Sequence, residues 1–185
     1  MLALTLPKLA LAVTLAAVQV PSPYQNPLYG FALTAPKSLT LCRDNPPTPN
    51  HGVFFLLDPP GTCPLAMSGE ASFVTIMASY NALEYRDLKD LVSKRCDRNA
   101  TRSVDSTGPK FSGTPTATCE IKDRLGRTHI DAFAFRKERK DKRLGRHPDD
   151  WILFEASLTT TPKRLKQDLE TFKAALKAIR FSPAP

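Results

Sequence analysis

The sequence has few glycines and few histidines, and both shortages limit the chemistry that it can carry. Its eight glycines are scattered and form no glycine-rich phosphate-binding loop. The three histidines, His51, His129 and His147, do not lie at the spacing of metal ligands, and the four cysteines include no CxxC pair. No G-x-S-x-G motif is present. These absences argue against a phosphate-binding loop, a zinc site and a serine hydrolase, and the sequence predicts no metal and no cofactor.

Charged side chains are also scarce in the first 42 residues, where only Lys8 and Lys37 occur. Residues 9–20 form a 12-residue apolar run, which is too short to span a bilayer but has the length of a signal-peptide core. Pro21 and Pro23 end this run. We predict that residues 1–22 are a signal peptide and that residues 23–185 form one domain. The alternative is a buried N-terminal helix.

An even number of cysteines behind a predicted export signal indicates disulfide bonds. The four are Cys42, Cys63, Cys96 and Cys119, and the sequence alone allows three pairings. We predict Cys42–Cys63 and Cys96–Cys119, because each pair closes a loop that contains turn residues. The location that follows is the periplasm or the outside of the cell. A cysteine nucleophile would need a free thiol beside a histidine, and four paired cysteines leave none.

The most regular hydrophobic pattern lies near the C-terminus. Strands are expected at residues 129–136 and 151–160, and a helix at residues 162–181. Every second residue of the later strand is apolar, which is typical of a half-buried strand. Thr161 is expected to cap the helix and Pro162 to take its first helical position.

Shorter elements are expected in the rest of the domain. The expected strands are residues 29–35, 39–42, 53–57, 72–80 and 117–122, with minor strands at 101–104 and 110–112. A first helix is expected at residues 82–96 with Asn81 as its cap, and residues 21–28 are expected to form a loose lead-in. Short connections imply antiparallel pairing. The predicted fold class is therefore α+β, a mainly antiparallel sheet flanked by two helices.

Two segments carry a resemblance to a known group of domains. Residues 30–36 (GFALTAP) resemble the G-F-x-L-x-x-P first strand of PsbP-like and DcrB-like domains, and residues 172–181 (FKAALKAIRF) resemble their closing helix and tail. The expected element order agrees, although the four cysteines are not part of the pattern. The resemblance implies an α/β/α sandwich in a group of mostly non-enzymatic proteins. These are photosystem accessory proteins, nuclear transport factors, envelope proteins and immunity proteins against toxins of type VI secretion.

On this resemblance we expect a non-enzymatic periplasmic or secreted binding protein. The particular hypothesis is an immunity protein that neutralises a secreted toxin. The alternative is an envelope accessory protein that assembles on a membrane complex or an anionic surface. Fold analogy alone does not choose between them.

A basic run between the last two strands is the clearest candidate for a partner-binding segment. Its positive residues are Arg136, Lys137, Arg139, Lys140, Lys142, Arg143 and Arg146. With Glu138 and Asp141 the run has a net charge of +5, out of +8 for the whole chain. Such a segment favours an acidic protein or an anionic membrane surface. It lacks the interleaved aromatic residues of nucleic-acid sites, so no nucleic acid is expected. The alternative is a solvated loop.

Two other groups of residues are candidates for function. Trp151 and Tyr80 are candidates for interface anchors, with ordinary packing in the core or at a sheet edge as the alternative. Carboxylates lie on the strands and in the charged connection, where they are more often solvated than catalytic. They are Asp131, Asp149, Asp150 and Glu155.

Overall fold

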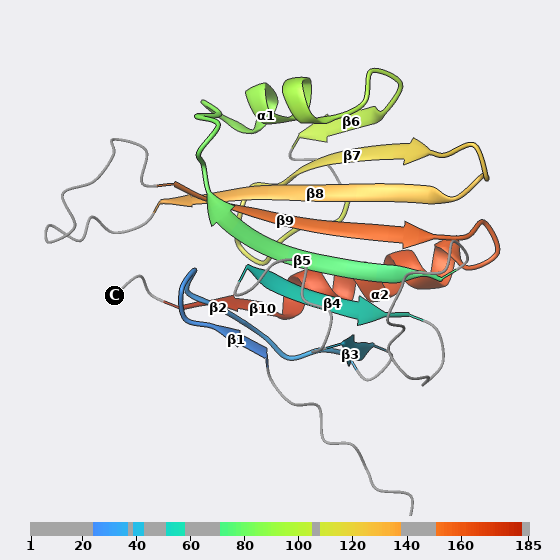
Figure 1. The fold of residues 1–185 in the computed structure, drawn as a ribbon, viewed down its shortest axis with the longest axis horizontal. Helices are drawn as coiled ribbons and strands as arrows, with labels where there is room; N and C mark the ends of the chain where they lie inside the picture. Colours follow the sequence, from blue (N-terminus) through green and yellow to red (C-terminus); the bar gives the residue numbers. More distant parts are fainter. Residues whose placement is uncertain are drawn as a thin grey trace, which may run out of the picture.

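Two antiparallel sheets and two helices make up the part of the chain that the computed structural model describes, residues 24–36, 39–42, 51–57, 71–104, 108–137 and 151–182 (Figure 1). The strands are β1 (Tyr24–Asn26), β2 (Phe31–Leu33), β3 (Thr40–Cys42), β4 (Gly52–Leu56), β5 (Phe73–Tyr80), β6 (Thr101–Val104), β7 (Ala117–Lys122), β8 (Thr128–Lys137), β9 (Trp151–Thr160) and β10 (Ile179–Phe181). The helices are α1 (Leu88–Arg95) and α2 (Leu165–Ala178). Neither helix in these residues has the length and apolar character needed to span a membrane.

The larger sheet is built around β9. Its strand order is β3-β4-β5-β9-β8-β7-β6, and a smaller sheet has the order β1-β2-β10. β9 pairs with β8 along its full length. Its other edge pairs with β5 over nearly the whole strand. Its alternating residues Phe154 and Leu158 are fully buried. The strand predicted at residues 151–160 and the antiparallel sheet are therefore confirmed.

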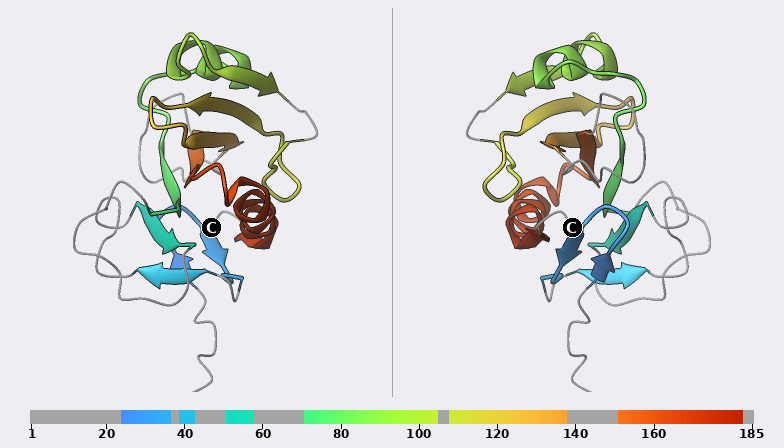
Figure 2. Two further views of the ribbon diagram at one scale, coloured as in Figure 1. Left: turned by 90° about the vertical axis from the view of Figure 1, so that its right-hand side faces the viewer. Right: turned by 90° about the vertical axis from the view of Figure 1, so that its left-hand side faces the viewer.

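The two helices cover opposite faces of the larger sheet. On one face, Phe172 and Leu176 of α2 share a buried cluster with Phe154 of β9, and β2 and β10 of the smaller sheet join the same cluster. On the other face, Leu91 of α1 packs in a second cluster with Phe133 of β8. Figure 2 views the strands nearly end-on and shows α2 beside the middle of the sheet and α1 at its β6 edge. The predicted α+β sandwich is confirmed.

The first helix is shorter than predicted. α1 begins at Leu88 rather than at residue 82, and Asp87 rather than Asn81 is its N-cap. The Asp87 carboxylate accepts a hydrogen bond from Asp90 N at 2.7 Å. The residues before it form a loop, in which Glu84 has a φ of 50°. That left-handed conformation is incompatible with a helix through this residue, so the prediction for residues 82–87 was wrong.

The second helix differs from the prediction at both ends. α2 begins at Leu165, and its N-cap residue Arg164 makes no side-chain capping bond, so Thr161 and Pro162 lie in a preceding turn. The helix ends at Ala178, and the last three predicted helical residues form β10, which pairs with β2. The apolar spacing continues through Ile179 because this residue is buried in the same core as the helix.

Three smaller predictions have mixed outcomes. The minor strand at residues 101–104 is confirmed as β6. Residues 110–112 are not a strand, because Phe111 instead turns into the core and lies 6.4 Å from the Phe154 ring. Residues 24–26 of the expected lead-in form β1, which pairs with β2.

One predicted disulfide is present in full. Cys96, the C-cap residue of α1, is bonded to Cys119 of β7 with a Cα–Cα distance of 5.9 Å. This bond ties the end of α1 to the sheet. Cys42 is also disulfide-bonded, and Cys63, its predicted partner, lies outside the described residues. The predicted signal peptide, residues 1–22, lies outside them as well.

Candidate binding surface

One end of the larger sheet gathers aromatic, aliphatic and cationic side chains from segments far apart in the sequence. At this end, on the left in Figure 1, β5 and β8 finish and β9 begins. Asn81 N, just after β5, donates to Trp151 O at 3.0 Å and so joins two of these strand ends. We call this surface the aromatic end and define it by Leu28, Tyr29, His51, Tyr80, Leu83, Arg136, Trp151 and Phe181.

Arg136 holds a fixed position on the aromatic end. It is adjacent to Ile152 in the sheet register, and Ile152 is in turn adjacent to Tyr80. Its guanidinium carbon lies 4.5 Å from the centre of the Phe181 ring, which is the geometry of a cation–π contact. Burial lowers the pKa of Arg136, but an arginine stays charged in proteins. The first residue of the basic run is therefore placed against the Phe181 ring.

Other aromatic rings lie at this end on both faces of the sheet. Tyr29 contacts His51 and Tyr80, with ring-centre distances of 5.3 Å and 5.6 Å, and its hydroxyl lies 3.3 Å from His51 Nδ1. Trp151 packs on Phe135 at 5.2 Å. Tyr80 is 43% exposed and Trp151 is partly exposed, so each presents part of its ring to solvent. The two candidate anchors therefore lie at the same end of the sheet but on opposite faces, because Tyr80 pairs with Ile152 and neighbouring strand residues alternate.

Leu28 is exposed at the tip of the turn between β1 and β2. The side chain of Asn26 is buried beneath this turn, where its Oδ1 accepts a bond from Tyr29 N at 3.1 Å. Its Nδ2 donates to the Tyr24 hydroxyl at 3.2 Å. These bonds fix the turn on both sides of Leu28, which remains 51% exposed.

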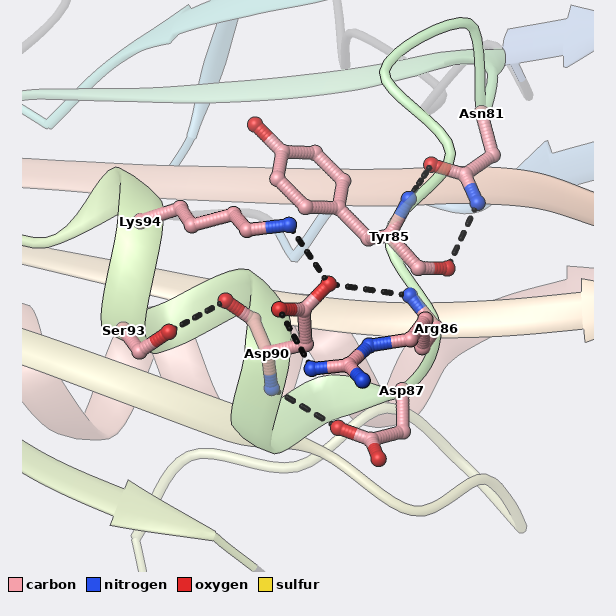
Figure 3. Close-up of polar contacts among 7 residues, drawn as sticks. All are labelled: Asn81, Tyr85, Arg86, Asp87, Asp90, Ser93 and Lys94. Carbon is pink, nitrogen blue, oxygen red and sulfur yellow. Dashed lines mark hydrogen bonds and ion pairs between the residues drawn. The ribbon is translucent and has the colours of Figure 1, made fainter.

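Leu83 has a similar setting in the loop between β5 and α1. The buried side chain of Asn81 accepts from Tyr85 N at 3.1 Å and donates to Tyr85 O at 2.8 Å (Figure 3). Leu83 lies inside this closed loop and is 66% exposed. The left-handed Glu84 follows it directly. Local strain of this kind persists only where surrounding contacts hold it.

The same loop is tied to α1 through Asp90. Its carboxylate accepts from Arg86 N at 3.1 Å and from Lys94 Nζ at 3.0 Å, and the Arg86 guanidinium lies 3.5 Å away (Figure 3). The bond from the Arg86 main chain, followed by that from Lys94, holds the pKa of this carboxyl below its usual range. The aspartate therefore stays ionised and anchors the loop to the helix.

The rest of the basic run is only partly within the described residues. Lys137 is the last residue of β8 and pairs in register with Trp151. The remaining predicted partner-binding residues lie outside the described part of the chain; they are Arg139, Lys140, Lys142, Arg143 and Arg146. Both strands that flank the run reach the aromatic end.

A carboxylate, an imidazole and a hydroxyl meet at the opposite end of the sheet. His129 Nε2 lies 3.1 Å from Asp123 Oδ2, and its Nδ1 lies 3.0 Å from Thr159 Oγ1. Arg127 Nε also donates to Asp123 at 2.7 Å. The spacing of these residues in the sequence does not reveal this contact, because only the strand register brings Thr159 beside His129. Thr159 is buried and so offers no accessible nucleophile, and the arrangement braces the hairpin between β7 and β8.

The strand carboxylates also have structural contacts. Glu155 accepts from the Arg95 guanidinium of α1 at 2.7 Å. Burial raises the pKa of Glu155, the Arg95 charge opposes that rise, and the Asp131 charge adds to it. Asp149 and Asp150 lie outside the described residues. Within the described part of the chain, no three His, Cys, Asp or Glu side chains are grouped so that they could hold a metal ion.

Comparison with known proteins supports the fold. No family model and no curated protein sequence matches the chain. The crystal structure of LpqN of Mycobacterium tuberculosis, described as involved in cell envelope biogenesis, is similar with a TM-score of 0.51 and 10% identity, over 90% of this chain and 88% of LpqN. The solution structure of cyanobacterial PsbP (CyanoP) from Synechocystis sp. PCC 6803 gives a TM-score of 0.43 and 12% identity, over 92% and 98%. The LpqN likeness shows the fold alone, and the α/β/α sandwich implied by the PsbP-like resemblance is confirmed at that level.

Proposed function

We propose that this chain is a non-enzymatic binding protein of an extracytoplasmic compartment, of the envelope accessory type, and that it engages an anionic partner through the aromatic end. The position of Arg136 carries this proposal. The residue begins the basic run and contacts the ring of Phe181, and in the sheet register only Ile152 separates it from the partly exposed Tyr80. Arginine and aromatic residues are enriched among the residues that dominate binding energy at interfaces.

The cysteines support the compartment. Cys96 and Cys119 form a disulfide, and Cys42 is disulfide-bonded too. Disulfides of this kind persist in oxidising compartments and are rare in the cytosol. The 12-residue apolar run near the N-terminus points the same way. N-terminal sequencing of the native protein tests export, because a chain that still begins at Met1 would contradict removal of a signal peptide.

The contacts of the titratable residues support a non-enzymatic role. His129 and Asp123 are used in the hairpin brace, and Glu155 is used in the ion pair with Arg95. Structural ion pairs perturb pKa values just as catalytic sites do, so the shifts alone indicate no catalysis. A screen with generic ester, peptide and glycan substrates tests this part of the proposal, and turnover of any of them would overturn it.

The immunity hypothesis names a particular anionic partner, a secreted toxin. A secreted toxin with an acidic groove is one partner that the basic run would attract. Support for this form would be a toxin-like open reading frame beside the gene of this protein. Without such a neighbour, the accessory form of the proposal is favoured.

The decisive experiment is a pull-down from the native envelope fraction with two matched variants. In the first, Lys140, Lys142, Arg143 and Arg146 are replaced together by Ser. In the second, four cations at the opposite end of the molecule are replaced by Ser; they are Lys122, Arg124, Lys163 and Lys166. Both variants lose the same charge. We expect the first to bind the captured partner at least about tenfold more weakly with a lower salt dependence, because charge pairs steer association, while the second stays near wild type. Equal behaviour of the two variants would overturn the proposal.

A further inference from the structure

The two exposed leucines of the aromatic end are presented in the same way. Each lies in a tight loop that is closed by a buried asparagine, Asn26 for Leu28 and Asn81 for Leu83. In each loop the asparagine Oδ1 accepts a main-chain bond from a buried tyrosine that follows the leucine. The leucines are therefore held outward at fixed positions rather than on loose chain.

The aromatic end also carries partly exposed rings and a cation. Tyr80 and Trp151 are amphipathic rings that are partly exposed, and Arg136 adds a cation at the same end of the sheet. Tyr and Trp rings favour the headgroup level of a membrane, and cations favour its anionic phosphates. Exposed aliphatic tips favour the acyl boundary just below. This end therefore carries a cation suited to the phosphates, Tyr and Trp rings suited to the headgroup level, and leucines suited to the acyl boundary.

We propose that the aromatic end docks on the surface of an anionic lipid bilayer, with Leu28 and Leu83 inserted at the acyl boundary. This inference rests on the proposed function and names its anionic partner as lipid. Charge complementarity carries the choice: Arg136 is a fixed cation at this end of the sheet, and the whole chain has a net charge of +8. Peripheral binding strengthens with both buried apolar area and attraction to anionic lipids, and this end supplies both.

The opposite end of the molecule provides an internal control. Leu125, in the turn between β7 and β8, is 74% exposed and is also held by a side-chain acceptor, because its N–H donates to Asp123 Oδ1 at 2.8 Å. The nearby side chains that hold this turn are Asp123, Arg127 and His129, which form the hairpin brace. Leu125 thus has the exposure and the fixed turn of the other two leucines but lies outside the aromatic end.

The test uses protein recovered after export and vesicles of two compositions. One is phosphatidylcholine alone, and the other contains roughly 30% phosphatidylglycerol, which carries the negative charge that basic residues recognise. Partition is measured by cosedimentation and by the emission of Trp151, the single tryptophan of the chain. We expect partition to the anionic vesicles, a blue shift of Trp151 emission, and loss of both at high salt.

The variants then locate the contact. The double substitution Leu28→Asp with Leu83→Asp should lower partition by about tenfold or more, because a buried leucine contributes about that factor. Leu125→Asp should leave partition unchanged. All three leucines are exposed, so the variants should fold, and thermal melting checks this; Leu28→Ser and Leu83→Ser give a milder pair if either aspartate variant melts early.

Three outcomes would overturn the membrane inference. They are no partition to anionic vesicles, equal partition to both compositions, and equal losses for the Leu125 variant and the double variant. If vesicles are not bound but the envelope pull-down captures a protein in a manner that depends on the basic run, the proposed function stands and the partner is a protein. If neither vesicles nor a protein depend on this end, both proposals fail.

Discussion

The side chain of Asn81 binds the main chain of Tyr85 in both directions, donating to its carbonyl at 2.8 Å and accepting from its N–H at 3.1 Å. The amide thus satisfies both main-chain polar groups of a buried residue that belongs to no helix or strand. Tyr85 in turn packs in the same apolar cluster as Leu91 of α1. One polar side chain therefore fixes both the loop that carries Leu83 and the entry into α1.

Replacing Asn81 with Ala should destabilise the protein. Two buried main-chain groups would lose their partner, and each unsatisfied group costs about 1–3 kcal/mol, so we expect a loss of at least about 2 kcal/mol. Asn99→Ala is the matched control, because Asn99 is exposed in the turn after α1. Denaturant unfolding measures both variants. Equal stabilities of the two would show that water replaces the asparagine bonds in this loop.

Replacing Phe172 with Ala should show that α2 is part of the core. The ring is fully buried on the face of the sheet that includes Phe154. We expect a loss of about 3–5 kcal/mol in the free energy of unfolding, from lost apolar burial and the cavity that remains. Leu125→Ala, at an exposed position, should change it by less than about 0.5 kcal/mol. An unchanged melting temperature for the Phe172 variant would mean that α2 is not docked as the structure has it.

The sequence predicted the strands better than the helix ends. β9 was predicted with its bounds because a central strand alternates along its full length, and both neighbouring strands impose the same two faces. The start of α1 was missed because Tyr85, Leu88 and Val92 are at helical spacing. Tyr85 is buried in the same cluster, but it reaches that cluster from a loop. Hydrophobic spacing indicates which residues are buried, but it does not show whether a helix or a loop places them in the core.

The sequence predicted single residues of the aromatic end but not their common position. Arg136, Tyr80 and Trp151 were each noted as candidates, but nothing in their spacing places them together. Their position at the same end of the sheet depends on the register of β5, β9 and β8, which is set by the whole sheet. Phe181 was expected at the end of a helix, and it reaches Arg136 because β10 pairs with β2 instead.

Removal of the Cys96–Cys119 disulfide should act mainly on α1. The bond joins two residues with a sequence separation of 23. Loop-closure entropy predicts that it contributes about 3 kcal/mol to the free energy of unfolding. In the double variant Cys96→Ala with Cys119→Ala we expect that loss, together with faster hydrogen exchange in α1 than in α2. Peptide mapping without reduction checks the pairing first, including the predicted Cys42–Cys63 link. Equal exchange in both helices would show that apolar packing alone holds α1.

The hairpin brace at Asp123 should make stability depend on acid pH. The hydrogen bond with His129, followed by the bonds with Arg127, holds the pKa of this carboxyl well below its usual range. Because the folded-state pKa is the lower one, the carboxylate stabilises the fold above its unfolded pKa of about 3.9. That contribution is lost as the pH falls below about 4 and approaches the folded-state pKa.

Asp123→Asn should therefore melt at a lower temperature than wild type at pH 7, and the difference should narrow as the pH approaches 2. The amide keeps an acceptor for the main-chain bonds of the turn, so the variant removes the charge more than the turn itself. Glu120→Gln, exposed on the neighbouring β7, is the matched control for the loss of one negative charge. A melting difference for Asp123→Asn that stays constant down to pH 2 would mean that the brace acts through hydrogen-bond geometry rather than through charge. In that case, the contacts of His129 and Arg127 with Asp123 would contribute no more than neutral bonds of the same length.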